Sequence, residues 1–309
     1  MKVFVVIPCY KVSKHILPLI QKIGPEVDKI IAVDDSCPES SGLLLKSKCK
    51  DGRLKIIYND ANLGVGGSMI VGYKQSLVDG ADIIVKIDGD GQMDPKLIQD
   101  FIQPIITNKA DYTKGNRFFD LKEIRQMPAS RIIGNAVLSF LTKFSTGYWN
   151  IFDPTNGYTA ISSKVLVTLD FEKISNRFFF ESDMLFRLGI GRHVVKDIPT
   201  HSIYGEEVSN LKIYKAIPEF LYKNLINFFK RIFYNYYLRD MNLASIELPF
   251  GFLMFFYGLY LAFSSWSNSH LTGISSPTGT LMLAMILITL GFQLLLSFFS
   301  FDISNTPKK

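Results

Sequence analysis

Two aspartates at the end of an apolar segment are the strongest candidates for chemistry in this chain. Asp88 and Asp90 follow the β-branched run 83–87, with Gly89 between them and Gln92 close behind. Because an isolated buried carboxylate is costly to keep ionised, a strand that ends in acids and glycines indicates a bound cation. Carboxylate and amide oxygens suit Mg²⁺ or Mn²⁺, and Mg²⁺ usually takes further ligands from substrate phosphates. The segment therefore predicts a metal-diphosphate site; the alternative is a polar turn with helix-capping aspartates.

A second acidic pair and a glycine-rich loop are candidates for nucleotide binding. Asp34 and Asp35 end a predicted strand and have the chemistry to accept hydrogen bonds from a nucleobase or a ribose; alternatively, they cap the following helix. The segment 62–67 contains three glycines, beginning with Gly64, but matches neither the dinucleotide nor the P-loop fingerprint. Its backbone either approaches a nucleotide at a helix N-terminus or forms an ordinary flexible turn.

Two arginines and two acids further along the chain are also candidates. Arg117 follows the strand-like segment 111–116, and Arg131 precedes a series of aromatic residues. Arginine is suited to binding phosphate oxygens; the alternative is a pair of solvated surface residues. Glu181 and Asp183 lie within an aromatic and aliphatic run, where acids are functional candidates. The alternative is that both face solvent from the start of a helix.

These residues need a scaffold that brings several strand ends together. Strands are predicted at 3–7, 29–33, 54–58 and 83–87, with helices near 16–23 and 64–77. This alternation indicates an α/β fold with a parallel sheet and right-handed crossovers. Open α/β sheets bind ligands at the carboxyl ends of their strands. We therefore expect the acidic residues and Arg117 to lie at one edge of the sheet.

Composition and charge favour a membrane partner over nucleic acid. The 309-residue chain is 48% hydrophobic and carries a formal net charge of +6. A basic balance is compatible with nucleic acid or with an anionic membrane surface, but no nucleic-acid-binding motif is found. Three cysteines without paired spacing fit a reducing, cytosolic compartment.

The C-terminal part of the chain predicts membrane attachment. Residues 213–245 mix aromatics with Lys and Arg, which is typical of helices in a membrane interface. Two uncharged apolar segments, 249–266 and 281–301, each have about the length of a transmembrane helix. Lys and Arg flank both ends of this pair, which predicts cytoplasmic ends and a short outer loop. The alternative is a buried helical hairpin in a soluble protein.

Five short motifs occur in an order that resembles a known enzyme family. They are Val6-Ile7-Pro8-Cys9-Tyr10, Val33-Asp34-Asp35-Ser36, Asn62-Leu63-Gly64, Asp88-Gly89-Asp90-Gly91-Gln92 and Gly115-Asn116-Arg117. Together they resemble family-2 glycosyltransferases with a GT-A nucleotide-sugar fold. The nearer resemblance is to dolichyl-phosphate-mannose-synthase-like enzymes and bacterial polyprenyl-phosphate glycosyltransferases, which share interfacial helices and a C-terminal pair of membrane helices.

The resemblance implies a role for each candidate residue. The nucleotide sugar would be bound by Pro8, Tyr10, Asp34, Asp35, Gly64 and Asp88. The metal, Mg²⁺ or Mn²⁺, would be held by Asp88, Asp90 and Gln92, and the acceptor phosphate by Arg117 and Arg131. Glu181 and Asp183 fall near the position of a general base in members that act on hydroxyl acceptors.

Two departures from the family patterns are visible. In the dolichyl branch a basic residue tends to precede the Tyr-Gly-Glu loop and a Lys to follow it, whereas here Ile203 precedes Tyr204 and Asn210 precedes Lys212. Donor-phosphate contacts in this loop are therefore in doubt. The chain also lacks a Gln-x-x-Arg-Trp sequence, which argues against a processive polysaccharide synthase.

The leading hypothesis is that the protein is an inverting glycosyltransferase with three parts. Residues 1–212 form a GT-A domain with a mixed, mainly parallel sheet. Residues 213–245 form amphipathic juxtamembrane helices, and residues 246–309 form a transmembrane hairpin. The protein would move one sugar from a UDP-sugar or GDP-mannose to a polyprenyl phosphate at the cytoplasmic membrane face, with oligomerisation through the membrane helices possible. One alternative is transfer to a hydroxyl of a glycan or glycolipid with Asp183 as base. Another is a non-catalytic membrane scaffold with a degenerate domain.

Overall fold

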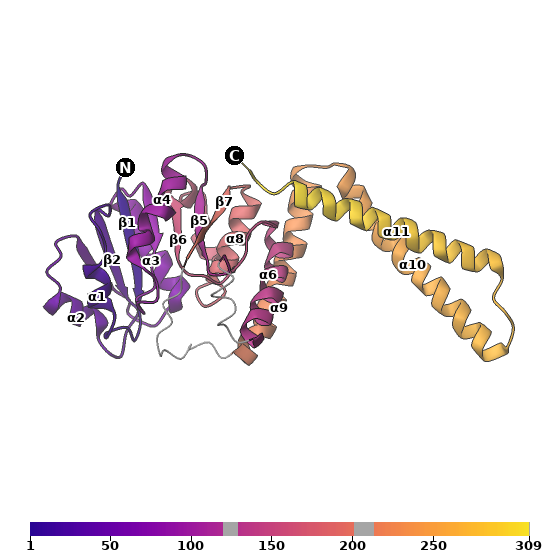
Figure 1. Ribbon diagram of the computed structural model, residues 1–309, viewed down its shortest axis with the longest axis horizontal. Coiled ribbons are helices and arrows are strands. Elements are labelled where there is room, and N and C mark those ends of the chain that lie inside the picture. The colour runs from indigo at the N-terminus through magenta and orange to yellow at the C-terminus, as the bar shows by residue number, and fades with distance from the viewer. Residues whose placement is uncertain (120–128, 201–212, 309) are drawn as a thin grey trace. The chain divides into compact units, whose positions relative to one another are not determined.

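The computed structural model describes the chain except for residues 120–128, 201–212 and 309 (Figure 1). The structure divides into two compact units. Residues 1–228 together with 307–309 form the first unit, and residues 229–306 form the second. The first unit contains the sheet and its covering helices, and the second contains the two long apolar helices.

The first unit alternates strands and helices, as predicted. Its strands are β1 (Val3–Cys9), β2 (Lys29–Asp34), β3 (Leu54–Tyr58), β4 (Ile83–Lys86), β5 (Tyr112–Asn116), β6 (Thr159–Ser162) and β7 (Val195–Pro199). Its helices include α1 (Ile16–Gln21), α2 (Ser41–Lys48), α3 (Gly64–Val78), α4 (Ile98–Ile106), α6 (Ala129–Thr146), α7 (Ser163–Leu166) and α8 (Phe180–Ile190), with 3₁₀ turns η1 (Pro95–Leu97) and η2 (Phe171–Lys173). Helix α9 (Ile213–Phe233) begins in this unit.

The strands form one sheet in the order β3-β2-β1-β4-β6-β5-β7. Strand β6 runs antiparallel to both of its neighbours, and every other pair is parallel. The prediction of a mixed, mainly parallel sheet is therefore confirmed. As a result, the carboxyl ends of β1, β2, β4, β5 and β7 meet at one edge, together with the amino end of β6.

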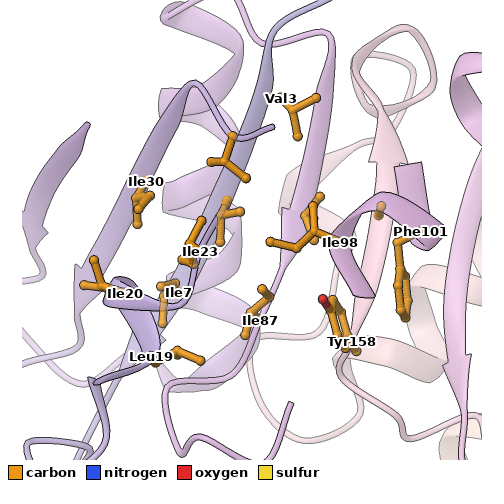
Figure 2. Close-up of a cluster of buried hydrophobic side chains, with 14 of the residues drawn as sticks. Val3, Ile7, Leu19, Ile20, Ile23, Ile30, Ile87, Ile98, Phe101 and Tyr158 are labelled. Carbon is orange, nitrogen blue, oxygen red and sulfur yellow. The ribbon is translucent and has the colours of Figure 1, made fainter. Parts of the chain in front are cut away.

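Two apolar clusters bury the two faces of the sheet. In β1, alternate residues go to opposite sides: Val5 and Ile7 join one cluster, and Phe4 and Val6 join the other. The first cluster packs α1 and α4 against the sheet, as Figure 2 shows for Leu19, Ile98 and other residues. The second packs α3 and α8 against the opposite face. A strand buried on both sides is apolar throughout, which explains the continuous runs in the sequence.

The second unit is dominated by two long helices, α10 (Leu243–Thr272) and α11 (Thr278–Ser304), preceded by the π-helical turn η3 (Tyr234–Arg239). Both helices are long and apolar enough to cross a membrane, and the predicted spans lie within them. They pack closely through small residues: a Cβ on Gly291 would lie 2.5 Å from the Phe255 nitrogen. Close backbone approach through glycine is typical of helix pairs in membranes.

A buried ion pair joins the two ends of the second unit. Arg231 donates to both carboxylate oxygens of Asp302, at 2.6 and 3.0 Å, and the Tyr236 hydroxyl donates to the same group at 2.6 Å. Both charged side chains are buried. Because three donors satisfy this carboxylate, the pair fixes the end of α9 to the end of α11.

Candidate active site

The edge formed by the carboxyl strand ends collects most of the candidate residues. Asp34 ends β2, and Asp88 follows β4 by two residues. Arg117 follows β5 directly, and the β7 register aligns Asn116 with Pro199. Topology therefore brings together side chains that lie far apart in the sequence, as predicted for this sheet.

Asp88 and Asp90 lie in the turn after β4. Asp88 is partly exposed, and the Oδ1 atom of Asp90 accepts a hydrogen bond from the backbone nitrogen of Gln92 at 3.0 Å. Gly91 allows the turn because its φ angle is +78°, in the left-handed region. Among the described residues, no group of three or more His, Cys, Asp and Glu side chains is arranged around a common metal position. Two carboxylates suit a Mg²⁺ or Mn²⁺ ion that takes its other ligands from substrate and water.

A buried lysine joins this turn to helix α8. Lys86 is fully buried, and its Nζ lies 2.6 Å from Asp88 Oδ1 and 3.1 Å from Glu181 Oε1. It also donates to the Gly157 carbonyl at 3.1 Å. Burial alone would lower the pKa of Lys86, but Asp88 and Glu181 outweigh it and raise the pKa above its usual value. Sequence reasoning missed Lys86, although a lysine inside an apolar strand is itself a signal.

The two acids of α8 serve different neighbours. Glu181 faces Lys86, whereas Asp183 Oδ2 accepts hydrogen bonds from the Ser175 nitrogen at 2.8 Å and from Arg187 at 3.2 Å. Asp183 is buried, and its carboxylate is used in hydrogen bonds within the domain. This environment is that of a structural group that anchors the loop before α8.

Asp34 and Asp35 organise the loops at the opposite end of the edge. Asp34 accepts hydrogen bonds from the backbone nitrogens of Cys37 at 2.8 Å and Gly42 at 2.6 Å, which matches the helix-capping alternative. Asp35 accepts from Leu63 and Gly64, both at 2.8 Å, and so fixes the start of α3. Both carboxylates are buried. Their backbone partners shape the loops beside the half-buried Pro8 and the exposed Tyr10.

The glycine-rich segment 62–67 lies against the loop formed by residues 175–177. Gly64 has a φ angle of +82°, and the nitrogen of Gly67 donates to the Asn176 carbonyl at 2.9 Å. A Cβ on Gly66 would lie 2.3 Å from the Ser175 carbonyl oxygen. These glycines therefore permit a close approach between α3 and the 175–177 loop.

Arg117 is held by a buried carboxylate. Its Nε and Nη2 atoms donate to the two oxygens of Asp153, each at 2.7 Å. Asp153 is fully buried, and Lys114 donates to its backbone carbonyl. This bidentate pair fixes the plane of the guanidinium group at the sheet edge. Arg131 belongs to α6, but its side chain lies outside the described residues, as do Ile203, Tyr204, Asn210 and Lys212.

Two groups beside Arg117 have shifted pKa values because they are buried. Burial lowers the pKa of Lys114 to about 8, and Asp153 and Asp197 oppose only part of this effect. Burial raises the pKa of Asp197 to about 6, despite Lys114 and hydrogen bonds from the Phe152 nitrogen and Asn116. Buried groups with shifted pKa values often mark functional sites.

An apolar hollow of about 350 Å³ lies at the end of β5, where Asn116 and Phe118, the chain neighbours of Arg117, contribute to its lining. Its described lining is formed by Asn116, Phe118, Phe119, Ile132, Ala136 and Phe152. Five of these six residues are apolar, so the hollow suits a hydrocarbon group.

The family of this chain follows from comparison with known proteins. The family model described as Glycosyl transferase family 2 matches residues 4–169, which include the sheet edge from β1 to β6. The chain therefore belongs to glycosyl transferase family 2, and its fold is the GT-A fold. The resemblance and the fold class inferred from the sequence motifs are confirmed.

The chain is similar to two named glycosyltransferases and to one solved glycosyltransferase structure. A UDP-N-acetylglucosamine–dolichyl-phosphate N-acetylglucosaminyltransferase of Methanococcus voltae is 30% identical over 218 residues, covering 66% of this chain and 86% of the relative. An undecaprenyl-phosphate mannosyltransferase of Micrococcus luteus is 28% identical over 203 residues, covering 63% and 82%. A glucosyl-3-phosphoglycerate synthase from Mycobacterium tuberculosis, solved with Mn²⁺, UDP and phosphoglyceric acid, matches with a TM-score of 0.56 at 14% identity and covers 74% of this chain and 78% of its own.

Proposed function

We propose that this protein is an inverting glycosyltransferase that moves a single sugar from a nucleotide-diphosphate donor to a polyprenyl phosphate at the cytoplasmic membrane face. The observation that carries the proposal is the pairing of an oriented Arg117 with an apolar hollow at the carboxylate-bearing sheet edge. A lipid phosphate needs both a cationic group for its head and an apolar surface for its first carbons. The named acceptors of the two relatives, dolichyl phosphate and undecaprenyl phosphate, support the same class.

The reaction is a single displacement. An oxygen of the acceptor phosphate forms a bond to the anomeric carbon, the bond from that carbon to the donor diphosphate breaks, and a nucleoside diphosphate leaves. A bound Mg²⁺ or Mn²⁺ supplies stabilisation of the charge on the leaving diphosphate. Asp88 and Asp90, with Gln92, would hold it, and Arg117 and Arg131 would orient the acceptor. Because the attacking phosphate is already anionic, no strong base is required.

Transfer to a hydroxyl acceptor is the second candidate, and it needs a general base such as Asp183. The carboxylate of Asp183 accepts hydrogen bonds from Ser175 and Arg187 and is buried. A general base must reach the proton that it removes, and one oxygen of this group is already bound within the fold. These contacts support the lipid-phosphate acceptor over the hydroxyl acceptor.

Exposed apolar helix faces in the first unit support a membrane-bound acceptor. Helix α6 exposes Ile133, Val137 and Phe140, and the first-unit part of α9 exposes Ile217, Leu221 and Leu225. The two helices contact each other, because Ser145 Oγ donates to Asn224 Oδ1 at 2.6 Å. Residues spaced by three and four form one stripe on each helix, as in helices that lie in a membrane interface.

A donor and acceptor screen tests the proposal directly. The full-length protein in lipid bilayers is offered UDP-sugars and GDP-mannose with either a polyprenyl phosphate or a free sugar acceptor, and products are identified by mass. We expect a glycosylated lipid phosphate, with UDP-N-acetylglucosamine the first donor to try, since it is the donor in one relative's name. A glycosylated hydroxyl with no lipid product would support the Asp183 alternative, and no product with any pair would support a scaffold.

The membrane orientation is a separate prediction. Lys and Arg asymmetry predicts that the catalytic unit and the C-terminal tail are cytoplasmic and that the end of α10, where Ser269 lies, and the loop after it are outside. In intact cells, a cysteine at position 269 (Ser269→Cys) in a background free of other cysteines should react with a membrane-impermeant thiol probe, whereas Lys308→Cys should not. The reverse labelling pattern would place the catalytic unit away from cytoplasmic nucleotide sugars.

A further inference from the structure

The most unusual charged group outside the assigned roles is the ammonium group of Lys86. Its side chain is fully buried, and its Nζ contacts Asp88, Glu181 and the Gly157 carbonyl at 2.6, 3.1 and 3.1 Å. These three acceptors match the three donors of an ammonium group. Lys86 therefore lies between two carboxylates, in the kind of position that a metal cation takes in other proteins.

The surroundings of Lys86 are built for this contact. A Cβ on Gly157 would lie 2.4 Å from both Lys86 Nζ and Asp88 Oδ2, so a larger residue at this position would displace the ends of these two side chains. Side chains alternate along a strand, so Lys86 lies on the same face of β4 as Ile84, the face that α8 covers, and its ammonium group meets Glu181 there. Glu181 is buried, and its carboxylate forms an ion pair with Lys86 at 3.1 Å.

We propose that Lys86 is a positioning residue that acts as a resident cation, that is, a positive charge held permanently at the site. Its ammonium group holds one oxygen of Asp88 and neutralises Glu181. As a result, the acids at this edge do not bind a divalent metal before the donor arrives. The inference rests on the proposed metal-dependent function and deepens it. A divalent cation next to Asp88 is repelled by the ammonium group, and the donor diphosphate supplies the negative charge that offsets this repulsion. Metal and nucleotide sugar should therefore bind together.

The key variant is Lys86→Met, which keeps the side-chain length and removes the charge. It leaves Asp88, Asp90 and Glu181 without the resident cation. We expect Mn²⁺ alone to bind tenfold more tightly or better, and the gain in Mn²⁺ affinity on adding UDP to shrink by a similar factor. A residue with a merely structural role would weaken metal binding on removal, so an increase distinguishes the two roles.

The measurement is Mn²⁺ binding to the full-length protein in detergent, followed by electron paramagnetic resonance with and without UDP. Lys114→Met is the matched control, because Lys114 is also a fully buried lysine but contacts backbone carbonyls rather than Asp88. We expect its Mn²⁺ affinity to equal that of the wild type. Unchanged or weaker binding of Mn²⁺ alone by folded Lys86→Met would overturn the inference.

Loss of Lys86 leaves Glu181 as an unpaired buried charge, and the single variant can fail to fold. The comparison of Lys86→Met/Glu181→Gln with Glu181→Gln removes this obstacle, since neither protein contains the Glu181 charge. The double variant should bind Mn²⁺ alone more tightly, and equal affinities would contradict the inference. If the wild type binds no Mn²⁺ even with UDP, the metal proposal and this inference both fall; a wrong acceptor assignment would appear only in the product screen.

Discussion

The sheet edge contains two buried lysines in equivalent places with opposite environments. Lys86 on β4 and Lys114 on β5 both pair with Thr159 of β6, so they flank the same residue across the sheet. Lys86 contacts two carboxylates, and its pKa is raised, whereas Lys114 contacts backbone carbonyls, and its pKa falls to about 8. The comparison shows that partners, and not burial alone, set the pKa of a buried group.

The two lysines also divide the edge into two sides. On the Lys86 side, one ammonium group contacts two carboxylates, those of Asp88 and Glu181. This leaves an excess of negative charge beside Asp90, which suits a divalent metal bound together with the donor diphosphate. On the Lys114 side, Arg117 is bound by Asp153, so the cation is oriented by an internal acid. We infer that the first side serves the donor and the second the acceptor, and four variants test this division.

The largest expected effect is on the donor side. Asp90→Asn keeps the volume of the side chain but removes a charge that the proposed metal needs, so turnover should fall by about a hundredfold or more while the fold is retained. Asp94→Asn is the matched control, since Asp94 accepts from the Lys96 nitrogen at the start of η1 and should matter little for turnover. Normal turnover of Asp90→Asn, or full activity in excess chelator, would contradict the metal site.

A smaller effect is expected on the acceptor side. Loss of one charge-assisted contact typically costs about 1.5–3 kcal/mol, roughly ten- to a hundredfold. Arg117→Ala and Arg131→Ala should therefore raise the KM for lipid phosphate or lower its use by this factor, with donor affinity much less changed. Donor affinity is measured by calorimetry, and acceptor use by transfer kinetics against lipid-phosphate concentration.

Asp153→Asn sharpens the same test, because it keeps Arg117 but removes the charge that orients it. It should lower acceptor use in the same direction as Arg117→Ala, and it should also lower the melting temperature, since Asp153 is fully buried. If the arginine variants lose donor binding but keep a normal acceptor dependence, the arginines belong to the donor side and the division is wrong.

The smallest expected effect is on stability. The pKa of Asp197 is raised from 3.8 to about 6, so the folded state favours the protonated form. Its contribution to stability is present below about pH 4 and is lost as the pH rises to about 6 and beyond. Asp197→Asn resembles the protonated form, so its melting temperature should exceed that of the wild type by a few degrees at pH 7 and equal it near pH 4. An equal difference at both pH values would exclude titration of Asp197 as the cause.

Local sequence patterns were sufficient to predict the sheet and the family. Apolar runs at 3–7, 29–33, 54–58 and 83–87 correspond to strands β1 to β4, and the ordered motifs identified glycosyl transferase family 2. These features depend on burial and on backbone geometry at strand ends, which neighbouring residues largely determine. The acids and Arg117 were placed at one edge for the same reason.

The partners of the candidate side chains were decided only by the tertiary structure. Asp34 and Asp35 bind loop nitrogens, and Asp153, not considered as a partner, holds Arg117. Lys86 and Glu181 are 95 positions apart in the chain and meet only because α8 packs on the sheet beside β4. The sequence by itself determined which residues lie at strand ends, because strand and turn preferences are local. The pairing of charged side chains depends on contacts between distant segments, and these contacts exist only once the chain has folded.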